Sequence, residues 1–339
     1  MTSTRRILSF AAGACILFSS VSGASAAAVT NTVVDSNIAA IPTDTATKLR
    51  EIGSKNSMAA IAALYTPNFP AGYLDKLQVA RDQHYGPAER NILDVMTQKG
   101  LPSGRPVVIF VHGGGFGSGN KSAADSPFYD NIPYWIATQG MVGVNVNYRY
   151  APASQWPSGI EDLTQIVAWV KQNIAQYGGD PNTIFFWGKS TGASHVADYI
   201  ADRVKRGQKP EIAGAIFTSG SFALGDKPLW ENYYGKDVSL YPERNALPNL
   251  VKSPTPLMAS YGEFDAQQYK DQFQLLLDAA NKAGKHVDAL YLRNHSHMSE
   301  TYAVGTPDDS LTGPVLTFIK AHSGKSGKSG QKSGQKSSK

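Results

Sequence analysis

The 339-residue chain contains one cysteine, Cys15. A single cysteine cannot form a disulfide within the chain, and a cysteine zinc site needs several thiolates at close spacing. Cys15 also lies within an N-terminal segment that resembles an export signal, so the processed chain would contain no thiol. The sequence therefore excludes a disulfide framework, a thiol nucleophile and a cysteine metal site in the mature protein.

The N-terminal apolar run, Ile7 to Val21, is too short and too interrupted by Gly and Ser to anchor the chain in a membrane. Arg5 and Arg6 precede it, and Ala24-Ser25-Ala26 offers a small-residue cleavage site. We expect residues 1–26 to be a signal peptide and the mature protein to be exported, to the periplasm or the exterior, without a stable membrane anchor. The arginine pair also fits a twin-arginine signal, and that alternative stays open.

Apolar and acidic residues are both absent from the C-terminal segment 323–339, which contains only Ser, Gly, Lys and Gln. This composition predicts a disordered tail. Removing its five lysines and the two signal arginines changes the formal net charge from +5 to −2. The high sequence pI of 9.0 therefore comes from the two ends, and we infer no nucleic-acid site from it.

The body, residues 27–322, is long enough for one large domain with a substantial core. Buried-type strands alternate with segments of helical periodicity, which predicts an α/β fold with a mostly parallel central sheet and helices on both faces. Ligands of such sheets bind at the carboxyl ends of the strands. The predicted strands are 77–81, 91–97, 106–111, 141–148, 183–187, 212–218, 256–261 and 287–292, and the predicted helices are 43–64, 128–139, 160–177, 193–206, 266–283 and 314–321.

Ser190 lies in the pentapeptide Gly-Lys-Ser-Thr-Gly (188–192), directly after the predicted strand 183–187 and before the predicted helix. A serine nucleophile presented on a sharp strand-to-helix turn needs small residues on either side, because side chains there would collide with the strand and the helix. The pentapeptide is a weak motif by itself, but its position between strand and helix makes it informative. The sequence therefore predicts an activated serine at position 190.

A serine hydroxyl needs a base, and the base needs an acid that orients it. If the chain order is serine, acid, histidine, both partners follow Ser190. Asp265 comes in the loop after the predicted strand 256–261, at the expected edge of the sheet, and is our candidate acid. Glu263 in the same loop is a competitor, and Asp265 could instead serve only as the N-cap of the following helix.

Two histidines, His295 and His297, follow the predicted strand 287–292 at its carboxyl end. His297 is our candidate base, and His295 is the alternative. Their spacing would also allow metal ligation, but no third ligand motif accompanies them. We therefore expect no metal site here.

The glycine-rich segment His112 to Gly119 follows the predicted strand 106–111. Glycines at this place let backbone N–H groups approach an oxyanion that develops during acyl transfer. The expected donors are the amides of Gly114, Gly115 and Thr191. A phosphate-binding loop is the rival interpretation, but the spacing of neither common glycine motif is present. His112 is expected to brace the loop rather than to transfer protons.

With these segments in hand, the chain resembles the α/β-hydrolases, and in particular the hormone-sensitive-lipase-like and carboxylesterase-related bacterial esterases that carry an HGGG loop. The resemblance covers about residues 80 to 320. It rests on four ordered segments: HGGGFGSG (112–119), NYRYAP (147–152), DPNTIFFWGKSTG (180–192) and GEFD (262–265).

This resemblance implies an α/β-hydrolase fold without a large cap domain, ester hydrolysis through an acyl-serine, and no cofactor. It implies a triad of Ser190, Asp265 and His297, with an oxyanion hole from Gly114, Gly115 and Thr191. It also implies that Tyr148-Arg149 and Glu161-Asp162 brace the fold. The expected partner is a small-molecule ester, and the oligomeric state stays open.

Two residues beside the serine depart from the family pattern. The preceding residue is usually Asp, Glu or Gln, whereas here it is Lys189. We expect a solvated side chain, and the alternative is that Lys189 helps to bind anionic groups. The following residue is usually Ala, whereas here it is Thr191, whose branched side chain would crowd the acyl pocket.

Our functional hypothesis is a secreted serine carboxylesterase for short-chain or aromatic esters. The aromatic-rich segment 221–253 could cover the pocket or could be ordinary core. One alternative is a serine amidase of the arylformamidase type, which would use the same residues. Another is a non-catalytic binding module on this fold, against which the complete set of triad candidates argues.

Overall fold

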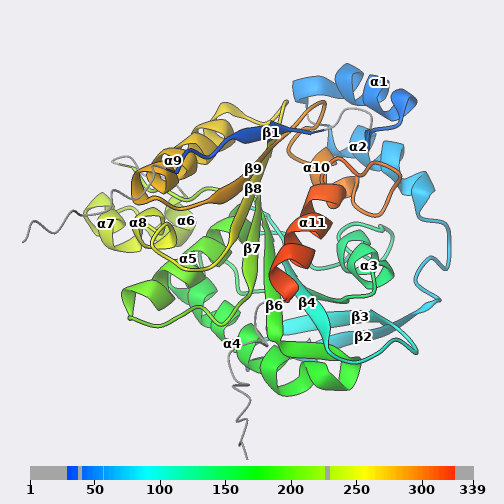
Figure 1. The fold of residues 1–339 in the computed structure, drawn as a ribbon, viewed down its shortest axis with the longest axis horizontal. Coiled ribbons are helices and arrows are strands. Elements are labelled where there is room, and N and C mark those ends of the chain that lie inside the picture. The colour runs from blue at the N-terminus through cyan, green and yellow to red at the C-terminus, as the bar shows by residue number, and fades with distance from the viewer. Residues whose placement is uncertain (1–28, 37–39, 56, 226–229, 325–339) are drawn as a thin grey trace, which may run out of the picture.

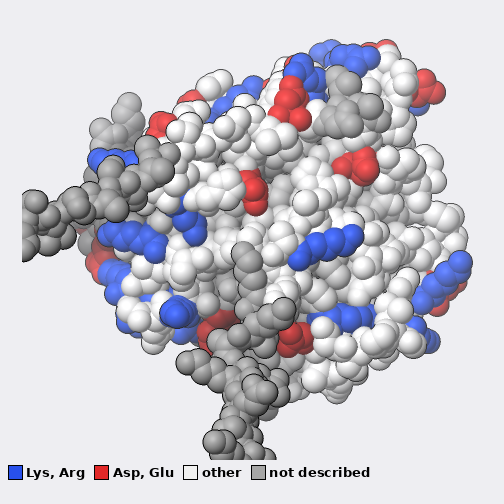
Figure 2. All heavy atoms as spheres, viewed as in Figure 1, with Lys and Arg blue, Asp and Glu red and all other residues white. Residues whose placement is uncertain are grey.

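The structure is a computed structural model that describes residues 29–36, 40–55, 57–225 and 230–324. The predicted signal peptide lies outside the described residues, as does the predicted tail beyond Gly324. None of the helices in the described ranges is long and apolar enough to cross a membrane. On the face shown in Figure 2, basic and acidic side chains are interspersed over a largely uncharged surface.

The described strands form one nine-stranded sheet in the order β1-β9-β8-β7-β6-β4-β5-β3-β2. Every neighbouring pair from β1 to β5 in this order is parallel, and β3 pairs antiparallel with both β5 and β2. This confirms the predicted mostly parallel sheet. The strand bounds are β1 Val33–Asp35, β2 Leu77–His84, β3 Ile92–Gln98, β4 Arg105–Val111, β5 Val142–Val146, β6 Gly179–Lys189, β7 Gly214–Thr218, β8 Leu257–Gly262 and β9 Val287–Leu292.

Helices cover both faces of the sheet, as Figure 1 shows. Residues of α4, α5, α8 and α9 pack on one face, whereas residues of α3 and α11 pack on the other. The helix bounds are α1 Thr43–Ile52, α2 Met58–Tyr65, α3 Asn131–Thr138, α4 Ser158–Asn173, α5 Thr191–Lys205, α6 Glu231–Tyr234, α7 Tyr241–Arg244, α8 Leu247–Leu250, α9 Gln267–Ala283, α10 Ser299–Tyr302 and α11 Thr312–Ser323.

The central strand β4 shows why an uninterrupted apolar run forms a core strand here. Val107, Ile109 and Val111 belong to the core on the α4/α5 face, while Val108 and Phe110 belong to the core on the α3/α11 face. Successive side chains of a strand point to opposite faces, so a strand covered on both sides needs apolar residues at every position. The alternation of helices and strands thus buries residues 107–111 of β4, and the carboxyl end of the strand continues into the loop that begins at His112.

Two features near the N-terminal end of the described chain differ from the sequence expectations. The predicted helix 43–64 is divided into α1 and α2 by the 3-10 turn Gly53–Lys55. The edge strand β1 was not predicted, because its three exposed residues carry no burial pattern and its order comes from pairing with β9. Elsewhere the expectation holds: in the described part of the connection from β7 to β8, the regular elements are the short helices α6, α7 and α8 and a 3-10 turn, which agrees with a fold without a large cap domain.

Candidate active site

Ser190 is the single residue between the end of β6 and the start of α5. Its backbone has φ 53° and ψ −122°, a combination that L-residues rarely adopt. A Cβ at Gly188 would lie 2.5 Å from Ala193 Cα, and a Cβ at Gly192 would lie 2.1 Å from the Val111 carbonyl oxygen. The two glycines are therefore required by the close approach of backbone on both sides of the serine.

The Ser190 side chain faces Gly113 and Tyr269. A Cβ at Gly113 would lie 2.9 Å from Ser190 Cβ, so the glycine loop after β4 borders the serine directly. Ser190 Oγ lies 3.5 Å from the Tyr269 hydroxyl. The Tyr269 ring in turn stacks on the His297 imidazole, with 4.2 Å between ring centroids. Tyr269 thus lies against both the serine and the histidine.

The two other triad candidates are in direct contact. His297 Nδ1 lies 2.8 Å from Asp265 Oδ1. The second oxygen of Asp265 accepts hydrogen bonds from the Gly262 amide, at 2.8 Å, and from the Ser219 hydroxyl, at 2.6 Å. Asp265 follows β8 and His297 follows β9, so two adjacent parallel strands bring the pair together at their carboxyl ends.

Electrostatics keep this pair in the charge states that base catalysis needs. Burial raises the pKa of the Asp265 carboxyl, but the His297 hydrogen bond and the Lys189 charge more than offset this, and the net pKa is lowered. Burial and the Lys189 charge lower the pKa of His297, against the opposing effect of Asp265. At neutral pH the carboxylate is therefore ionised and the imidazole is neutral. No hydrogen bond joins Ser190 to His297 in the described chain, so the serine side chain would have to rotate to reach it.

The two competing candidates lie elsewhere. Glu263 accepts a hydrogen bond from the Asn294 amide at 2.8 Å. His295 is fully buried, with Nε2 at 2.8 Å from Ser310 Oγ and 3.4 Å from Asp308 Oδ2. His295 thus belongs to a separate polar cluster behind the site. Asp265 is not the N-cap of α9, since Ala266 occupies that position without a side-chain cap.

The glycine loop after β4 is held through its carbonyl groups. The Gly114 carbonyl accepts from the amides of Gly117 and Ser118 and from the Ser118 hydroxyl. The Gly115 carbonyl accepts from Asn232 Nδ2 at 3.1 Å. In the ranges that the structure covers, the amides of Gly114, Gly115 and Thr191 donate to no acceptor. These three N–H groups are therefore available to an oxyanion, as an oxyanion hole requires.

The Thr191 side chain is turned into the protein. It is buried, and its Oγ1 accepts a hydrogen bond of 3.4 Å from the Phe116 amide. The threonine thus links α5 to the glycine loop after β4. This contact gives the departure from the usual alanine a local structural reason.

Aromatic residues of the segment 221–253 pack against the same loop. The Phe116 ring stacks on Tyr233 at 4.3 Å and meets Trp230 edge-on at 5.7 Å. A Cβ at Gly115 would lie 3.4 Å from the Trp230 ring. Tyr233 and Tyr234 are buried in this cluster, whereas Trp230 is half-buried. The two tyrosines are therefore core residues, and Trp230 borders the glycine loop after β4.

Lys189 corrects the expectation of a solvated side chain. It is only 1% exposed, and its ammonium group forms an ion pair with Glu300, which is 0% exposed. Glu300 lies in α10, three residues after His297. A buried lysine needs a buried counter-charge, which the short helix α10 supplies. Neither Glu300 nor Ser219 was identified from the sequence, because no local pattern links them to the serine.

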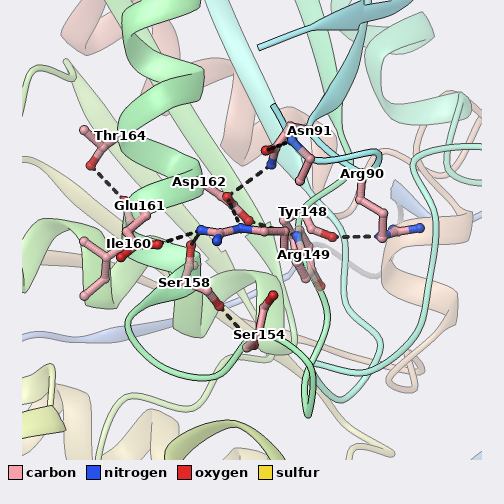
Figure 3. A network of polar contacts seen from close by, with 12 residues as sticks. Arg90, Asn91, Tyr148, Arg149, Ser154, Ser158, Ile160, Glu161, Asp162 and Thr164 are labelled. Atoms are coloured by element: carbon pink, nitrogen blue, oxygen red, sulfur yellow. Dashed lines mark hydrogen bonds and ion pairs between the residues drawn. The ribbon is translucent and has the colours of Figure 1, made fainter. Parts of the chain in front are cut away.

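The expected bracing groups include a polar network around Arg149 (Figure 3). Arg149 Nε donates to Asp162 Oδ1 at 2.8 Å, and Arg149 Nη2 donates to Glu161 at 2.7 Å. Asn91 also donates to the buried Asp162 carboxylate. His112 is fully buried and stacks on Tyr148, and burial lowers its pKa to about 4. These groups fix the loops that follow β4 and β5.

Asp265, His297 and Glu300 are the described residues whose ligand atoms lie close enough together to hold a metal ion. However, the Lys189 ammonium already pairs with Glu300, and His297 Nδ1 is engaged by Asp265. A second cation would lie against the lysine charge. The contacts are those of a hydrogen-bonded charge network, and they do not fit a metal centre.

Comparison with known proteins gives related sequences over part of the chain. Residues 93–208 match the BD-FAE family model. The esterase LipQ of Mycobacterium tuberculosis is 36% identical over 41% of this chain and 32% of its own length. A bile salt-activated lipase of Rattus norvegicus is 30% identical over 50% of this chain and 30% of its own length. The chain thus spans about a third of the length of these curated relatives.

Solved structures match the fold over most of the chain. Esterase B from Lactobacillus rhamnosis has a TM-score of 0.64 at 17% identity, and covers 83% of this chain and 97% of its own. A bacterial heroin esterase has a TM-score of 0.60 at 21% identity, covering 84% and 95%. The sheet order and these structural similarities show an α/β-hydrolase fold, and part of the chain is similar in sequence to an esterase and a lipase.

Proposed function

We propose that this protein is a serine hydrolase that cleaves carboxylic esters through an acyl intermediate on Ser190. The observation that carries the proposal is the arrangement around the serine. A strained serine stands at the apex of the turn between β6 and α5, next to unpaired loop amides and next to a bonded Asp265–His297 pair. The relative LipQ is named as an esterase and the Rattus norvegicus relative as a bile salt-activated lipase, which supports an ester as the substrate.

In the proposed reaction, Ser190 Oγ rotates toward His297 Nε2 and transfers its proton there while it attacks the ester carbonyl carbon. The amides of Gly114, Gly115 and Thr191 donate to the resulting oxyanion. The imidazolium, held by Asp265, returns the proton to the departing alkoxide, which leaves as the alcohol. Water then repeats the sequence on the acyl-serine, releases the acid and restores the serine hydroxyl.

The preference for short-chain or aromatic esters is part of this proposal. It rests on the closeness of Trp230 to Gly115, which places an aromatic ring next to the proposed oxyanion donors. The described helices of the connection from β7 to β8 are only four residues long each, which supports the same preference, because such helices offer little sheltered apolar surface for a long acyl chain. Export stays a prediction from residues 1–26, and a signal-sequence fusion assay would test it.

Labelling with a fluorophosphonate probe tests the serine chemistry. We expect stoichiometric labelling of the wild-type chain, none of Ser190→Ala, and strongly reduced labelling of His297→Ala. An active His297→Ala protein together with an inactive His295→Ala protein would overturn the assignment of the base. Comparing the hydrolysis of p-nitrophenyl acetate with that of N-formylkynurenine separates an esterase from an arylformamidase. A wild-type chain that binds esters without turnover and resists labelling would instead support the binding-module alternative.

A further inference from the structure

A buried charge network lies directly behind the Asp265–His297 pair. The Ser219 hydroxyl lies 2.6 Å from Asp265 Oδ2 and 2.5 Å from Glu300 Oε1. Glu300 in turn pairs with Lys189, the residue before the proposed nucleophile. The network therefore runs from the acid of the proposed triad back to the serine turn.

The hydrogen count at Ser219 makes this network sensitive to protonation. A hydroxyl has one hydrogen to donate, yet two carboxyl oxygens lie within hydrogen-bonding distance of it. When Glu300 is ionised, the Ser219 hydrogen can satisfy only one of the two carboxylates. When Glu300 is protonated, it can donate to Ser219 Oγ while Ser219 donates to Asp265. The protonation state of Glu300 thus determines which hydrogen bonds reach Asp265.

The charges lead to the same dependence. With Glu300 ionised, Lys189 balances one of the two carboxylates, and one negative charge remains to stabilise a protonated His297. With Glu300 neutral, Lys189 balances Asp265, and no negative charge remains for the imidazolium. The ionised network therefore favours the proton transfer that the proposed reaction needs, and the neutral one opposes it.

Glu300 is placed to change its charge near neutral pH. Burial raises the pKa of its carboxyl to about 7, although the Lys189 charge lowers it and the Asp265 charge raises it further. Its Oε2 has no hydrogen-bond partner in the described part of the chain. The groups that face Glu300 come from several elements: Lys189 from β6, Ser219 after β7, Asp265 after β8, His297 after β9 and Tyr129 before α3. Burial raises the pKa of the Tyr129 hydroxyl, and Tyr302 and the Glu300 charge raise it further by smaller amounts.

We propose that Glu300, held by Lys189, is a positioning residue that acts through Ser219 on Asp265 and so sets the basicity of His297. The inference rests on the proposed serine hydrolase function. Ionised Glu300 makes His297 a better base, and protonated Glu300 makes it a weaker one.

The test is the pH profile of kcat/KM for p-nitrophenyl acetate, with active sites counted by fluorophosphonate titration. For the wild type we expect a rise through a step near pH 7, above the lower step that belongs to His297. Glu300→Gln fixes the group in a neutral state, so the upper step should disappear and kcat/KM at pH 8 should fall about tenfold, with KM little changed. Lys189→Met removes the charge that lowers the Glu300 pKa, so the step should move to higher pH.

Three further variants keep the test decisive. Lys189→Arg retains the charge and should leave the step in place. The double variant Lys189→Met/Glu300→Gln removes one charge of each sign, so it leaves the net charge of the network unchanged. It should lack the step, and it carries the test if a single variant fails to fold. Glu211→Gln removes a carboxylate from the exposed ion pair with Lys171 and should leave the profile unchanged.

Two outcomes would contradict the inference and can be told apart from failure of the proposed function. If the wild type is labelled and Glu300→Gln or the double variant keeps the upper step, Glu300 does not tune the base. If Lys189→Arg removes the step, the position acts through packing and not through its charge. If the wild type is neither labelled nor active, the serine hydrolase proposal itself fails.

Discussion

The hydroxyl of Tyr269 lies 3.5 Å from Ser190 Oγ, while its ring is stacked on the imidazole of His297. One side chain from the first turn of α9 thus contacts both groups that the proposed reaction must bring together. The stack orients the plane of the imidazole, and the hydroxyl lies at the outer limit of hydrogen-bonding distance from the serine.

Two substitutions distinguish the ring stack of Tyr269 on His297 from the contact of its hydroxyl with Ser190. Tyr269→Phe keeps the stack and removes the hydroxyl, so kcat/KM for p-nitrophenyl acetate should stay within about threefold of the wild type. Tyr269→Ala removes the stack, and kcat should fall at least about tenfold because the imidazole is no longer fixed. Steady-state kinetics at saturating ester measures both. Equal losses in the two variants would show that the hydroxyl, and not the ring, is what matters.

Gly113, in the glycine loop after β4, lies against Ser190 and leaves no room for a side chain of its own. The added Cβ of Gly113→Ala would lie 2.9 Å from Ser190 Cβ and 3.1 Å from the Lys189 carbonyl oxygen. We expect kcat/KM to fall about 100-fold through displacement of the serine. Gly225→Ala is the matched control, because no atom of the described residues, its chain neighbours aside, lies within 4 Å of its added Cβ. Similar activity of both variants would contradict the close approach.

His295 should matter for stability rather than for chemistry. Its Nε2 contacts Ser310 and Asp308, and its Nδ1 lies 3.1 Å from Ser299 Oγ. Asp308 also accepts a hydrogen bond from Tyr65 at 2.9 Å. His295→Asn leaves buried polar groups unpaired, at a cost of about 2 kcal/mol in the free energy of unfolding. Denaturant unfolding should show this loss, while kcat per labelled active site changes little. A stable but inactive variant would make His295, and not His297, the candidate base.

His195 predicts how stability depends on pH. It is fully buried among Phe116, Tyr148 and Tyr233, and both ring nitrogens lack a hydrogen-bond partner in the described chain. Burial lowers its pKa to about 3, with a smaller contribution from His112. The unfolded chain binds a proton near pH 6.5 and the folded chain does not. The stabilisation is therefore complete above pH 6.5 and is lost toward pH 3, by about 1.4 kcal/mol for each pH unit.

His195→Leu should remove this contribution. As the pH falls from 6.5 to 5, the free energy of unfolding should decrease less steeply in the variant than in the wild type. The two slopes against pH should differ by at most the amount that corresponds to one proton bound on unfolding. Urea unfolding at several pH values measures the difference. His112 is present in both proteins and contributes equally to the pH dependence of both. Parallel curves for the two proteins would mean that His195 can take up a proton in the folded state.

Arg149 should contribute mainly to folding. Its guanidinium satisfies Asp162, whose side chain is completely buried. Arg149→Met leaves this carboxylate without its cation, and we expect a loss of about 3 kcal/mol in the free energy of unfolding. Asp162→Asn added to that variant should recover part of the loss. No recovery would indicate that the arginine acts by packing against the loop after β5.

The sequence by itself determined the features that depend on local pattern. Apolar runs such as 106–111 identified the central strands, and the glycines around Ser190 identified the sharp turn, because backbone strain and close packing restrict those positions to few residue types. The order of strands also determined where Asp265 and His297 would lie, since the carboxyl ends of parallel strands meet at one edge of a sheet.

Only the tertiary structure decided the contacts between residues far apart in the chain. Lys189 is charged and flexible, so its sequence context favours exposure, yet Glu300 from α10 allows it to be buried. Strand β1 exists through pairing with β9, and Tyr269 meets Ser190 only because α9 follows the loop of Asp265. The energy of such contacts comes from partners more than 75 residues away, which no local window of sequence contains.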